Sequence, residues 1–266
     1  MFQFEDPIKN ISLFDHIIHF YSLNFNGNKI ILAKCNKEDL KINKIELRNK
    51  ILMKNIFWSK SELEDIKKFL EKDQISRLQE WIITRSMVKY GIGVVFNELF
   101  GSIIKIPFSN IFLNSSRKKK PWLEIELKNN NELKRKIKET DISISHSRKK
   151  IYVAFSQNQI GIDCEEIQDF SKRLISKIIK EREYNQIEEL IKDFNINSKN
   201  FINSIIWTIK ESTLKANGRK TVTAIQEIQI SNDDNSLISY FPQDHEKYIN
   251  YINIDNNSIF TISMKL

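Results

Sequence analysis

The sequence is poor in cysteine, glycine and proline, with two, six and four residues of these types among 266. Cys35 and Cys164 have no Cys or His neighbours at zinc-ligand spacing, so neither a disulfide framework nor a zinc site is expected. No run approaches the ~20 apolar residues that a membrane span requires. The N-terminus MFQFEDPIKN also lacks the basic start and apolar core of a secretory signal. These absences predict a protein of the cytoplasm that has no membrane association.

Apolar residues make up 41% of the chain, which contains 17 Phe and 4 Trp, so a sizeable core is expected. The formal net charge is +8, but the excess of Lys accompanies an excess of Asn and Ile that is typical of an AT-rich genome. A basic surface favours anionic partners. Charge alone does not choose between nucleic acid, phosphorylated ligands and an acidic protein.

The N-terminal part of the sequence combines a strand hairpin with two helices. HIIHFYSL and KIILAKC are strand runs within residues 12–34, split by the turn-forming stretch NFNGN. Ser61, with Glu64 three residues on, predicts the start of the first helix. Apolar residues on one side predict a longer helix over about 74–99, and a polar basic loop, NSSRKKKP, follows at 114–121.

The C-terminal part repeats this plan after a polar stretch near 128–140. The runs ISIS, IYVAFS and IGIDCE predict strands, and helices are expected over about 170–192 and 200–217. Strands followed by a long helix thus occur twice, so we expect two related halves that meet near residue 130. Three residues of the first long helix recur at the same mutual spacing in the last: Trp81, Ser86 and Lys89 against Trp207, Ser212 and Lys215.

The segment IGIDCEEI places Asp163 and Glu165 two residues apart on an expected strand. Side chains at i and i+2 share a face of a strand, and two carboxylates there repel each other unless a cation or a proton lies between them. Hard divalent ions such as Mg²⁺ take oxygen ligands in this way. Two solvated acids at a strand end are the simpler alternative, and Glu166 beside them shows how common such acids are.

The segment WTIKESTLKANG has helical spacing and ends at Gly218, a residue type that terminates helices. Trp207, Glu211 and Lys215 lie at i, i+4 and i+8 and form one stripe of this helix. In isolation, an acid and a base one turn apart indicate an ordinary exposed ion pair worth a few tenths of a kcal/mol.

The segment SISHSRKK places His146 between Ser145 and Ser147 at the end of an expected strand, and three cations follow. A lone His is usually structural. Small hydroxyl residues and nearby cations, however, suit the close approach of a phosphate group.

The three segments occur in the order SHS, GIDxE and WxxKESxxKxxG, and this order resembles the 4'-phosphopantetheinyl transferases of the Sfp type. The length is similar to that type and not to the short trimeric holo-acyl-carrier-protein synthases. The resemblance covers roughly 74–218 and is strongest over 143–218. Three further segments resemble family features: KKKP at 118–121 its Gly-Lys-Pro element, REY at 182–184 an acid after the GIDxE strand, and RLQEWIITR at 77–85 its Arg-containing helix.

The resemblance implies an α+β fold of two similar halves related by a pseudo-twofold axis. Each half would be a small antiparallel sheet packed on a long helix, with the active site in the cleft between them. Residues 1–130 would supply cations on the nucleotide side and dock a carrier protein, and residues 131–266 would hold the transferase motifs and the metal site. Because the two halves take the place of two subunits, the resemblance also implies a monomer.

The implied reaction is that of a holo-[acyl-carrier-protein] synthase. It transfers 4'-phosphopantetheine from CoA to a serine of an apo acyl or peptidyl carrier protein and releases adenosine 3',5'-bisphosphate. By resemblance, Asp163, Glu165 and Glu211 would bind Mg²⁺ together with the CoA pyrophosphate. The residues expected to bind CoA are Arg77, Lys120, Ser145, His146 and Lys215.

The resemblance also implies catalytic roles for Glu211, Glu183 and Lys215. Lys215 would stabilise the charge that develops on the bridging oxygen of the diphosphate. The carrier serine needs a base, for which the candidates are Glu183 or a metal-bound water held by Glu211.

The chain departs from the family pattern at several positions. Lys119 stands where the family has Gly before Lys-Pro. Ser76 occupies the place of the family's arginine for the CoA 3'-phosphate, and Arg77 falls one position away. Arg85 is expected to support the fold or the cleft. Cys164 replaces an aliphatic residue between two metal ligands and is expected to point into the core without chemistry.

The alternative function is a nucleic-acid-binding protein or a metal-dependent nuclease, which the charge of +8 and the paired acids suggest. The dispersed lysines and the lack of a glycine-aromatic RNA-binding motif count against it. The sequence does not choose between Mg²⁺ and Mn²⁺. It also leaves the pathway open between fatty acid, polyketide, siderophore and other peptide synthesis.

Overall fold

The structure is a computed structural model that describes residues 2–13, 16–37, 57–103, 105–116, 119–127, 130–191, 198–219, 222–233, 236–255 and 257–266. Its strands form two five-stranded sheets and one two-stranded sheet, all antiparallel. The antiparallel α+β class expected from the sequence is therefore confirmed. Two residues of the predicted basic loop, 117 and 118, and the start of the polar stretch, 128 and 129, lie outside the described residues.

The first large sheet has the order β1-β2-β3-β7-β6. Its strands are β1 (Lys9–Leu13), β2 (His16–Phe25), β3 (Asn28–Asn36), β6 (Asp141–His146) and β7 (Lys150–Ser156). The second has the order β8-β12-β11-β10-β9. Its strands are β8 (Ile160–Glu166), β9 (Gln229–Asp233), β10 (Ser236–Phe241), β11 (Glu246–Asp255) and β12 (Ser258–Lys265). The small sheet pairs β4 (Ile111–Asn114) with β5 (Trp122–Ile125).

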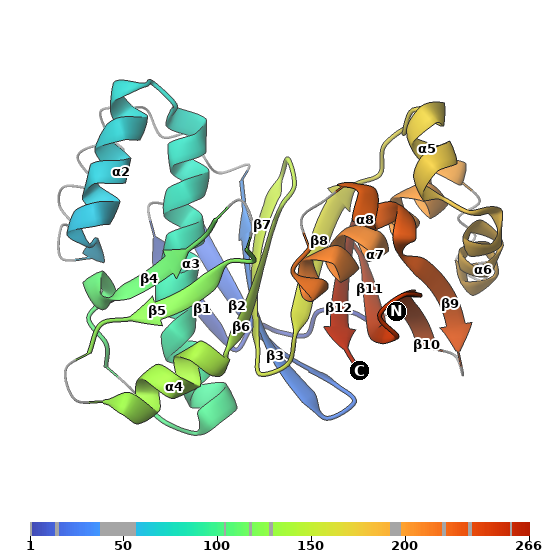
Figure 1. The fold of residues 1–266 in the computed structure, drawn as a ribbon. Helices are drawn as coiled ribbons and strands as arrows, with labels where there is room; N and C mark the ends of the chain where they lie inside the picture. Colours follow the sequence, from blue (N-terminus) through green and yellow to red (C-terminus); the bar gives the residue numbers. More distant parts are fainter. Residues whose placement is uncertain are drawn as a thin grey trace.

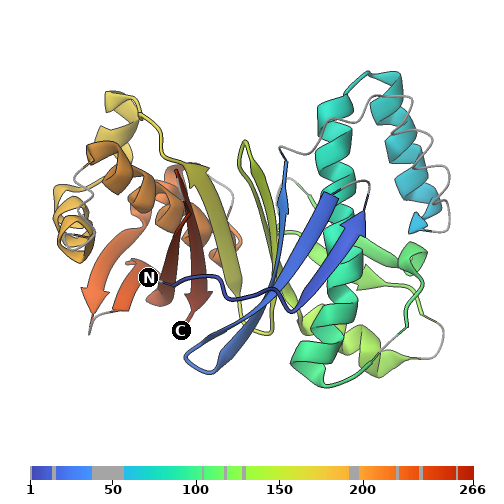
Figure 2. The same cartoon turned by 180° about the vertical axis from the view of Figure 1, so that it is seen from behind.

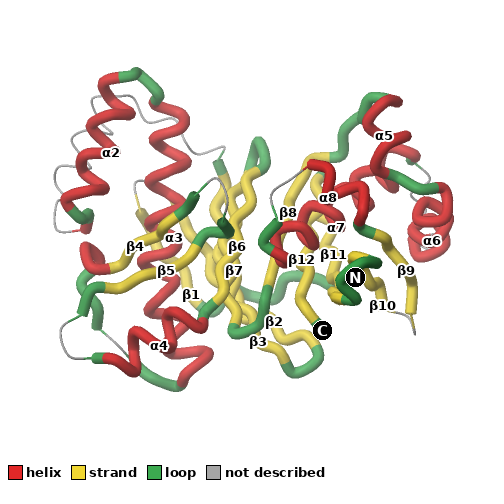
Figure 3. Tube along the Cα trace, viewed as in Figure 1, coloured by secondary structure: helices red, strands yellow, loops and turns green. Residues whose placement is uncertain are grey.

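The helices lie on the outer sides of the two large sheets, which occupy the middle of the molecule (Figures 1, 2 and 3). On the side of the first sheet are α2 (Lys60–Glu71), α3 (Ile75–Phe100), the short 3₁₀ helix η2 (Phe108–Asn110) and α4 (Asn131–Glu139). On the side of the second are α5 (Lys172–Ile178), α6 (Glu181–Ile191), α7 (Lys199–Asn217) and α8 (Val222–Glu227). No helix within these described ranges is long and apolar enough to cross a membrane.

Several local predictions agree with the structure. The hairpin β2–β3 turns at Asn26 and Gly27, which have φ of 51° and 79° and so take the left-handed conformation that a tight hairpin turn requires. The long helix predicted over about 74–99 is α3. At the end of α7, Gly218 has φ of 82° and its N–H donates to the carbonyl of Leu214 at 3.0 Å, so it is the predicted C-cap.

Two helix boundaries differ from the prediction. The chain contains two overlapping Ser-x-x-Glu pairs, and the capping box of α2 uses Ser59 with Glu62 and not Ser61 with Glu64. Glu62 is selected because it also forms an ion pair with Lys89 at 2.9 Å, which places it in the core. The helix predicted over 170–192 is divided into α5 and α6.

The molecule has four layers, and apolar clusters fill the spaces between neighbouring layers. Residues of α3 such as Met87 and Val88 pack on the outer face of the first sheet. The inner faces of the two sheets share a cluster that includes Leu32, Ile162 and Phe260. A third cluster lies between α7 and the outer face of the second sheet, where its members include Ile205, Ile206, Ile209, Ile252 and Ile259.

The strand pairing divides the chain later than the sequence predicted. β6 and β7 follow residue 130, yet β7 pairs with β3 and so belongs to the first sheet. The change from one sheet to the other occurs at residues 157–159, whereas the two halves were expected to meet near residue 130. Each large sheet has a long helix on its outer side, as expected, and the pseudo-twofold relation between the halves stays a prediction.

The N-terminal segment contacts the second sheet before the chain enters the first. The N–H of Phe2 donates to the carbonyl of Ile252 at 3.0 Å, and the Asn253 side-chain amide donates to the carbonyl of Phe2 at 2.8 Å. The rings of Phe4 and Phe260 lie 5.9 Å apart between centroids. Figure 2 shows the N-terminus beside the strands of the second sheet.

The backbone of α7 lies directly against β8 at Gly161. A Cβ atom on residue 161 would lie 1.8 Å from the Ser212 carbonyl oxygen and 2.4 Å from the Ala216 nitrogen. Both are backbone atoms, so neither can move away without moving the helix. Hydroxyl pairs join α7 to β12 on the same side: Thr208 with Thr261 at 2.8 Å and Ser212 with Ser263 at 2.6 Å.

This contact makes Gly161→Ala a test of the fold. We expect the substitution to lower the free energy of unfolding by an amount at or above the upper end of the roughly 1 to 3 kcal/mol typical of overpacking. Gly93→Ala is the matched control, because Gly93 lies on α3 and a Cβ added there would meet no described atom within 4 Å. It should stabilise the protein by about 0.5 to 1 kcal/mol. Urea unfolding measures both, and equal stability of Gly161→Ala and the unmodified protein would contradict the described contact.

Candidate active site

β8 is an edge strand of the second sheet, and side chains of β6 satisfy its outward backbone N–H groups. Three alternate residues of β8 donate to three alternate side chains of β6: Ile160 to Asp141 at 2.7 Å, Ile162 to Ser143 at 3.0 Å and Cys164 to Ser145 at 3.1 Å. We call this set the side-chain ladder. It joins the two sheets without strand pairing and covers an edge that would otherwise be open.

Two lysines bind the carbonyl groups of the same edge. Lys120 donates to the carbonyl of Ile160 and forms an ion pair with Asp141. Lys215 donates to the carbonyl of Ile162 at 3.1 Å. The edge of β8 is therefore lined by ammonium groups from the loop before β5 and from α7, and both groups lie where the two sheets meet.

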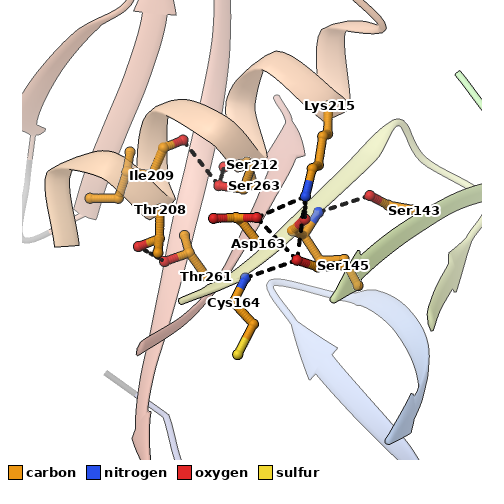
Figure 4. A network of polar contacts seen from close by, with 11 residues as sticks. Ser143, Ser145, Asp163, Cys164, Thr208, Ile209, Ser212, Lys215, Thr261 and Ser263 are labelled. Atoms are coloured by element: carbon orange, nitrogen blue, oxygen red, sulfur yellow. Dashed lines mark hydrogen bonds and ion pairs between the residues drawn. The ribbon is translucent and has the colours of Figure 1, made fainter. Parts of the chain in front are cut away.

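Asp163 is at the centre of the candidate site (Figure 4). One carboxylate oxygen, Oδ1, accepts from the Lys215 ammonium at 2.8 Å and from the Ser145 hydroxyl at 3.0 Å. The residue is only 4% exposed, and its other oxygen, Oδ2, has no hydrogen-bond partner among the described residues. A buried carboxylate oxygen without a hydrogen-bond donor lowers the stability of the fold unless a ligand interacts with it.

Glu165 and Glu211 lie close enough to Asp163 for its charge to act on both. Burial, followed by the charge of Asp163, raises the pKa of Glu165 to about 7. The charge of Glu211 also contributes to this shift. Burial and then the charge of Asp163 raise the pKa of Glu211 above its ordinary value as well. The carboxylates predicted to bind a metal therefore repel one another, as the sequence indicated for Asp163 and Glu165.

The side chains do not form a closed set of metal ligands in their present positions. Over the described ranges, no group of three or more His, Cys, Asp and Glu side chains has the spacing that holds a metal ion. Lys215 instead neutralises Asp163. Two features nevertheless fit a hard divalent cation: the buried Oδ2 of Asp163 has no donor among the described residues, and the charges of the neighbouring carboxylates repel one another.

A pocket of about 400 Å³ opens beside this cluster. Its walls come from both halves and include Lys120, Ser143, Glu211, Lys215 and Arg219. The structure thus brings together Lys120, Lys215 and Glu211 as predicted. Arg219 and Ser143 were missed in the sequence. Ser143 could have been found from the alternation of Asp141, Ser143 and Ser145 on one face of a strand.

His146 lies on the strand of Ser145 but points to different partners. Its Nε2 is 3.2 Å from the Thr84 hydroxyl, and its Nδ1 is 3.7 Å from the Glu80 carboxylate. Lys37 forms an ion pair with the same carboxylate at 2.6 Å. Burial lowers the pKa of His146 and outweighs the opposing effect of Glu80, so the imidazole is neutral at pH 7. Lys37, Glu80 and Thr84 were not identified from the sequence.

The two arginines predicted on α3 have different surroundings. Arg77 is exposed near the start of the helix and is not part of the pocket wall. Arg85 packs over the Trp81 ring at 3.7 Å from its centroid and lies 3.8 Å from Glu62. Arg85 therefore supports the packing of α2 on α3, which is one of the two roles expected for it.

Glu183 is not in the cluster, which corrects its prediction as a base near the diphosphate. The residue is 2% exposed, and its carboxylate pairs with the fully buried Lys210 at 2.8 Å. It also accepts from the N–H groups of Lys180 at 3.1 Å and Ile230 at 3.2 Å. Both carboxylate oxygens are thus engaged in holding α6 to α7 and β9, which indicates a structural role.

Cys164 points away from the cluster into the core between the sheets, as predicted. It is fully buried, and burial raises the pKa of its thiol to about 12. The thiol is therefore protonated at neutral pH, and no chemistry is expected from it.

The raised pKa of Glu165 has a consequence for stability. In the folded protein this carboxyl has a pKa of about 7, against 4.5 for the ordinary group. The folded state therefore binds the proton more tightly, and stability falls as the pH rises through the window between these values. Glu165→Gln cannot ionise, so in a chelator it should gain up to about 3 kcal/mol over the unmodified protein at pH 8 and nothing at pH 4.

Denaturant unfolding at the two pH values measures this gain. Glu189→Gln, at an exposed position of α6, is the control and should change stability by less than about 0.5 kcal/mol at either pH. A Glu165→Gln variant no more stable at pH 8 than the unmodified protein would contradict the raised pKa of Glu165, which burial and then the charge of Asp163 produce.

Comparison with known proteins yields a family match to the C-terminal part of the chain. Residues 159–260 match the sequence model of the 4'-phosphopantetheinyl transferase superfamily. This segment contains Asp163, Glu165, Glu211 and Lys215, and it ends within β12. The Ser and His of the SHS segment lie just before it.

A named relative points to the same superfamily at low identity. The chain is 25% identical over 138 residues to a protein of Aneurinibacillus migulanus named 4'-phosphopantetheinyl transferase gsp. The match spans 52% of this chain and 51% of that protein, so the chain aligns with about half the length of its relative. Residues 159–260 are therefore similar to the 4'-phosphopantetheinyl transferase superfamily, which confirms the resemblance that the motifs indicated.

Proposed function

We propose that this protein transfers 4'-phosphopantetheine from CoA to a serine of an apo acyl or peptidyl carrier protein and releases adenosine 3',5'-bisphosphate. The observation that carries this proposal is the grouping of Asp163, Glu211 and Lys215 beside a pocket built from both halves. The family match and the name of the relative support it. The two-half chain and its length favour the Sfp type over the short trimeric synthases.

The pocket beside Lys215 is our proposed site for the diphosphate of CoA. Lys120, Lys215 and Arg219 contribute positive charge to its wall, and about 400 Å³ is within the range of small-molecule sites. Ser145 and His146 at the end of β6 and Arg77 on α3 extend the set that we propose for the rest of CoA. Of these, Arg77 is the weakest member, because it lies outside the pocket wall.

Lys215 has the position that charge stabilisation requires. In the transfer, the carrier serine oxygen bonds to the phosphorus that bears pantetheine, and the bond from that phosphorus to the bridging oxygen breaks. Negative charge develops on the departing adenosine 3',5'-bisphosphate, and a fixed ammonium group beside it lowers the barrier. The Lys215 side chain is 31% exposed, so its ammonium can leave Asp163 to meet a phosphate.

Asp163, Glu165 and Glu211 are the residues that would hold Mg²⁺. When bound, the cation would neutralise the diphosphate and stabilise the charge that develops on it. Glu211 is our candidate for accepting the proton of the carrier serine, directly or through a water. Burial and the charge of Asp163 raise the pKa of its carboxyl, which moves it toward the value that suits a base near neutral pH.

The remaining parts of the proposal concern partners and setting. Carrier proteins of this type are small and acidic, and the net charge of +8 would speed their encounter with this protein. We propose that the protein acts as a monomer in the cytoplasm. A nucleic-acid-binding protein or nuclease is not favoured, because Lys120, Lys215 and Arg219 line one small pocket and the family match points elsewhere.

The direct test is incubation with CoA, Mg²⁺ and several diverse apo carrier proteins, followed by mass spectrometry of the carriers. We expect the phosphopantetheine adduct with the unmodified protein. Asp163→Asn and Glu211→Gln should reduce the rate by on the order of 100-fold or more, because each removes charge from the proposed metal site. Glu166→Gln is the matched control, since Glu166 follows on the same strand and alternates to the opposite face.

Glu166→Gln should keep a rate near that of the unmodified protein. Absence of the adduct with all carriers contradicts the proposed function, and full activity of Asp163→Asn or Glu211→Gln contradicts the metal assignment. Cleavage of random DNA in Mg²⁺ by the unmodified protein, without any adduct, would favour the nuclease instead.

A separate prediction distinguishes a structural from a catalytic role of Glu183. Glu183→Gln leaves the buried ammonium of Lys210 without its counter-ion, so it should cost roughly 3 to 5 kcal/mol of stability. At a temperature where the variant remains folded, its transfer rate should be close to normal. Thermal unfolding and the transfer assay measure both, with exposed Glu181→Gln in the same helix as control. A stable variant without activity would restore Glu183 as a base.

A further inference from the structure

We propose that Ser145 is a positioning residue that holds the Asp163 carboxylate in the orientation that a divalent cation needs. This inference rests on the proposed function, because it concerns the same cluster. It assigns Ser145 a role toward the carboxylate and not only toward CoA.

Among the described residues, the Ser145 hydroxyl has one acceptor for its proton. A serine hydroxyl can donate one hydrogen bond and accept two. The N–H of Cys164 donates to it at 3.1 Å, and the Lys215 ammonium lies 3.4 Å from it. Both of these groups are donors, so neither can take the serine proton. The proton therefore points to Oδ1 of Asp163, which is 3.0 Å away (Figure 4).

This hydrogen bond determines which oxygen of Asp163 is available. Oδ1 receives the Ser145 hydroxyl and the Lys215 ammonium, while the buried Oδ2 receives no donor from the described residues. Because the two oxygens of a carboxylate are chemically equivalent, these bonds fix the plane of the group: one oxygen faces both donors and the other faces away from them. Oδ2 is therefore the oxygen that is left for a cation.

Of the two donors, Ser145 is the one that is fixed. Lys215 has a long side chain that is 31% exposed and, in the proposed reaction, contacts a phosphate. Ser145 is 3% exposed, and its oxygen is held by the backbone of the strand that carries Asp163. When Lys215 leaves Asp163, Ser145 remains as the donor to Oδ1.

Ser145 also connects the two halves, because it lies on β6 and Asp163 lies on β8. Ser143 is one step along the same side-chain ladder and accepts from the Ile162 N–H at 3.0 Å. It makes the same kind of backbone contact from the same strand, but no bond from it to Asp163 is present in the described part of the chain. Comparing variants of the two serines therefore distinguishes an effect on the fold from an effect on the position of the Asp163 carboxylate.

The experiment measures the affinity of the CoA-free protein for Mn²⁺, from the electron paramagnetic resonance signal of the free ion. Mn²⁺ prefers oxygen ligands as Mg²⁺ does. Ser145→Ala should weaken Mn²⁺ binding by about 10- to 100-fold, the effect typical of losing a hydrogen bond to a metal ligand. Ser143→Ala and Ser145→Ala should lower the thermal unfolding midpoint by similar amounts. Ser143→Ala, however, should change the Mn²⁺ affinity less than about twofold. Ser145→Thr keeps the hydroxyl and should retain most of the affinity.

Equal Mn²⁺ affinities of Ser145→Ala, Ser143→Ala and the unmodified protein overturn the inference, as does the absence of Mn²⁺ binding by the unmodified protein. If Ser145→Ala does not fold, Ser145→Cys takes its place, because it keeps the side-chain shape and donates a much weaker hydrogen bond. Transfer to carrier proteins is measured separately on the unmodified chain. Equal Mn²⁺ affinities together with normal transfer contradict only the role of Ser145. Absence of transfer together with the expected differences in Mn²⁺ affinity contradicts only the proposed function.

Discussion

α7 can lie against β8 only because residue 161 has no side chain. The approach brings the helix backbone within van der Waals distance of the strand, and the hydroxyl pairs between α7 and β12 suit the same short separation. Asp163 follows Gly161 on the same face of β8, and Lys215 stands on the facing stripe of α7. The distance between strand and helix therefore determines whether a carboxylate and an ammonium group meet. A larger residue at 161 would separate them without touching either.

The second requirement is the side-chain ladder between β6 and β8. An ordinary strand pair would have merged the two sheets into one, with the cluster and its pocket closed off by backbone. Serine and aspartate side chains hold the strands together at a greater separation, while lysines bind the carbonyl groups that remain. Three of the residues that satisfy the edge, Ser143, Lys120 and Lys215, also line the pocket. Ser145 combines a hydrogen bond from the β8 backbone with one to the Asp163 carboxylate.

Local patterns in the sequence predicted much of this arrangement. The Asn-Gly hairpin turn, the C-cap at Gly218 and the burial of Cys164 depend on neighbours in sequence or on strand alternation, and all agree with the structure. The assignment of β6 and β7 to the first sheet could not be predicted, because it depends on which distant strand offers the better partner. Glu183 was misjudged for a similar reason: its partner Lys210 is 27 positions away and buried with it. Proximity in sequence to the GIDxE strand carried no information about that contact.

The order of strands in the second sheet also bears on how the protein is synthesised. β8 pairs with β12, whose residues leave the ribosome roughly a hundred positions after Asp163. Until then the strand that carries the acidic residues has no partner in its own sheet, although every motif residue has been translated. Phe2 and Phe4 likewise meet Ile252 of β11 and Phe260 of β12 only after those strands have been made. The surroundings of Asp163 are therefore completed only after β12 has been made, well after the residues of the cluster itself.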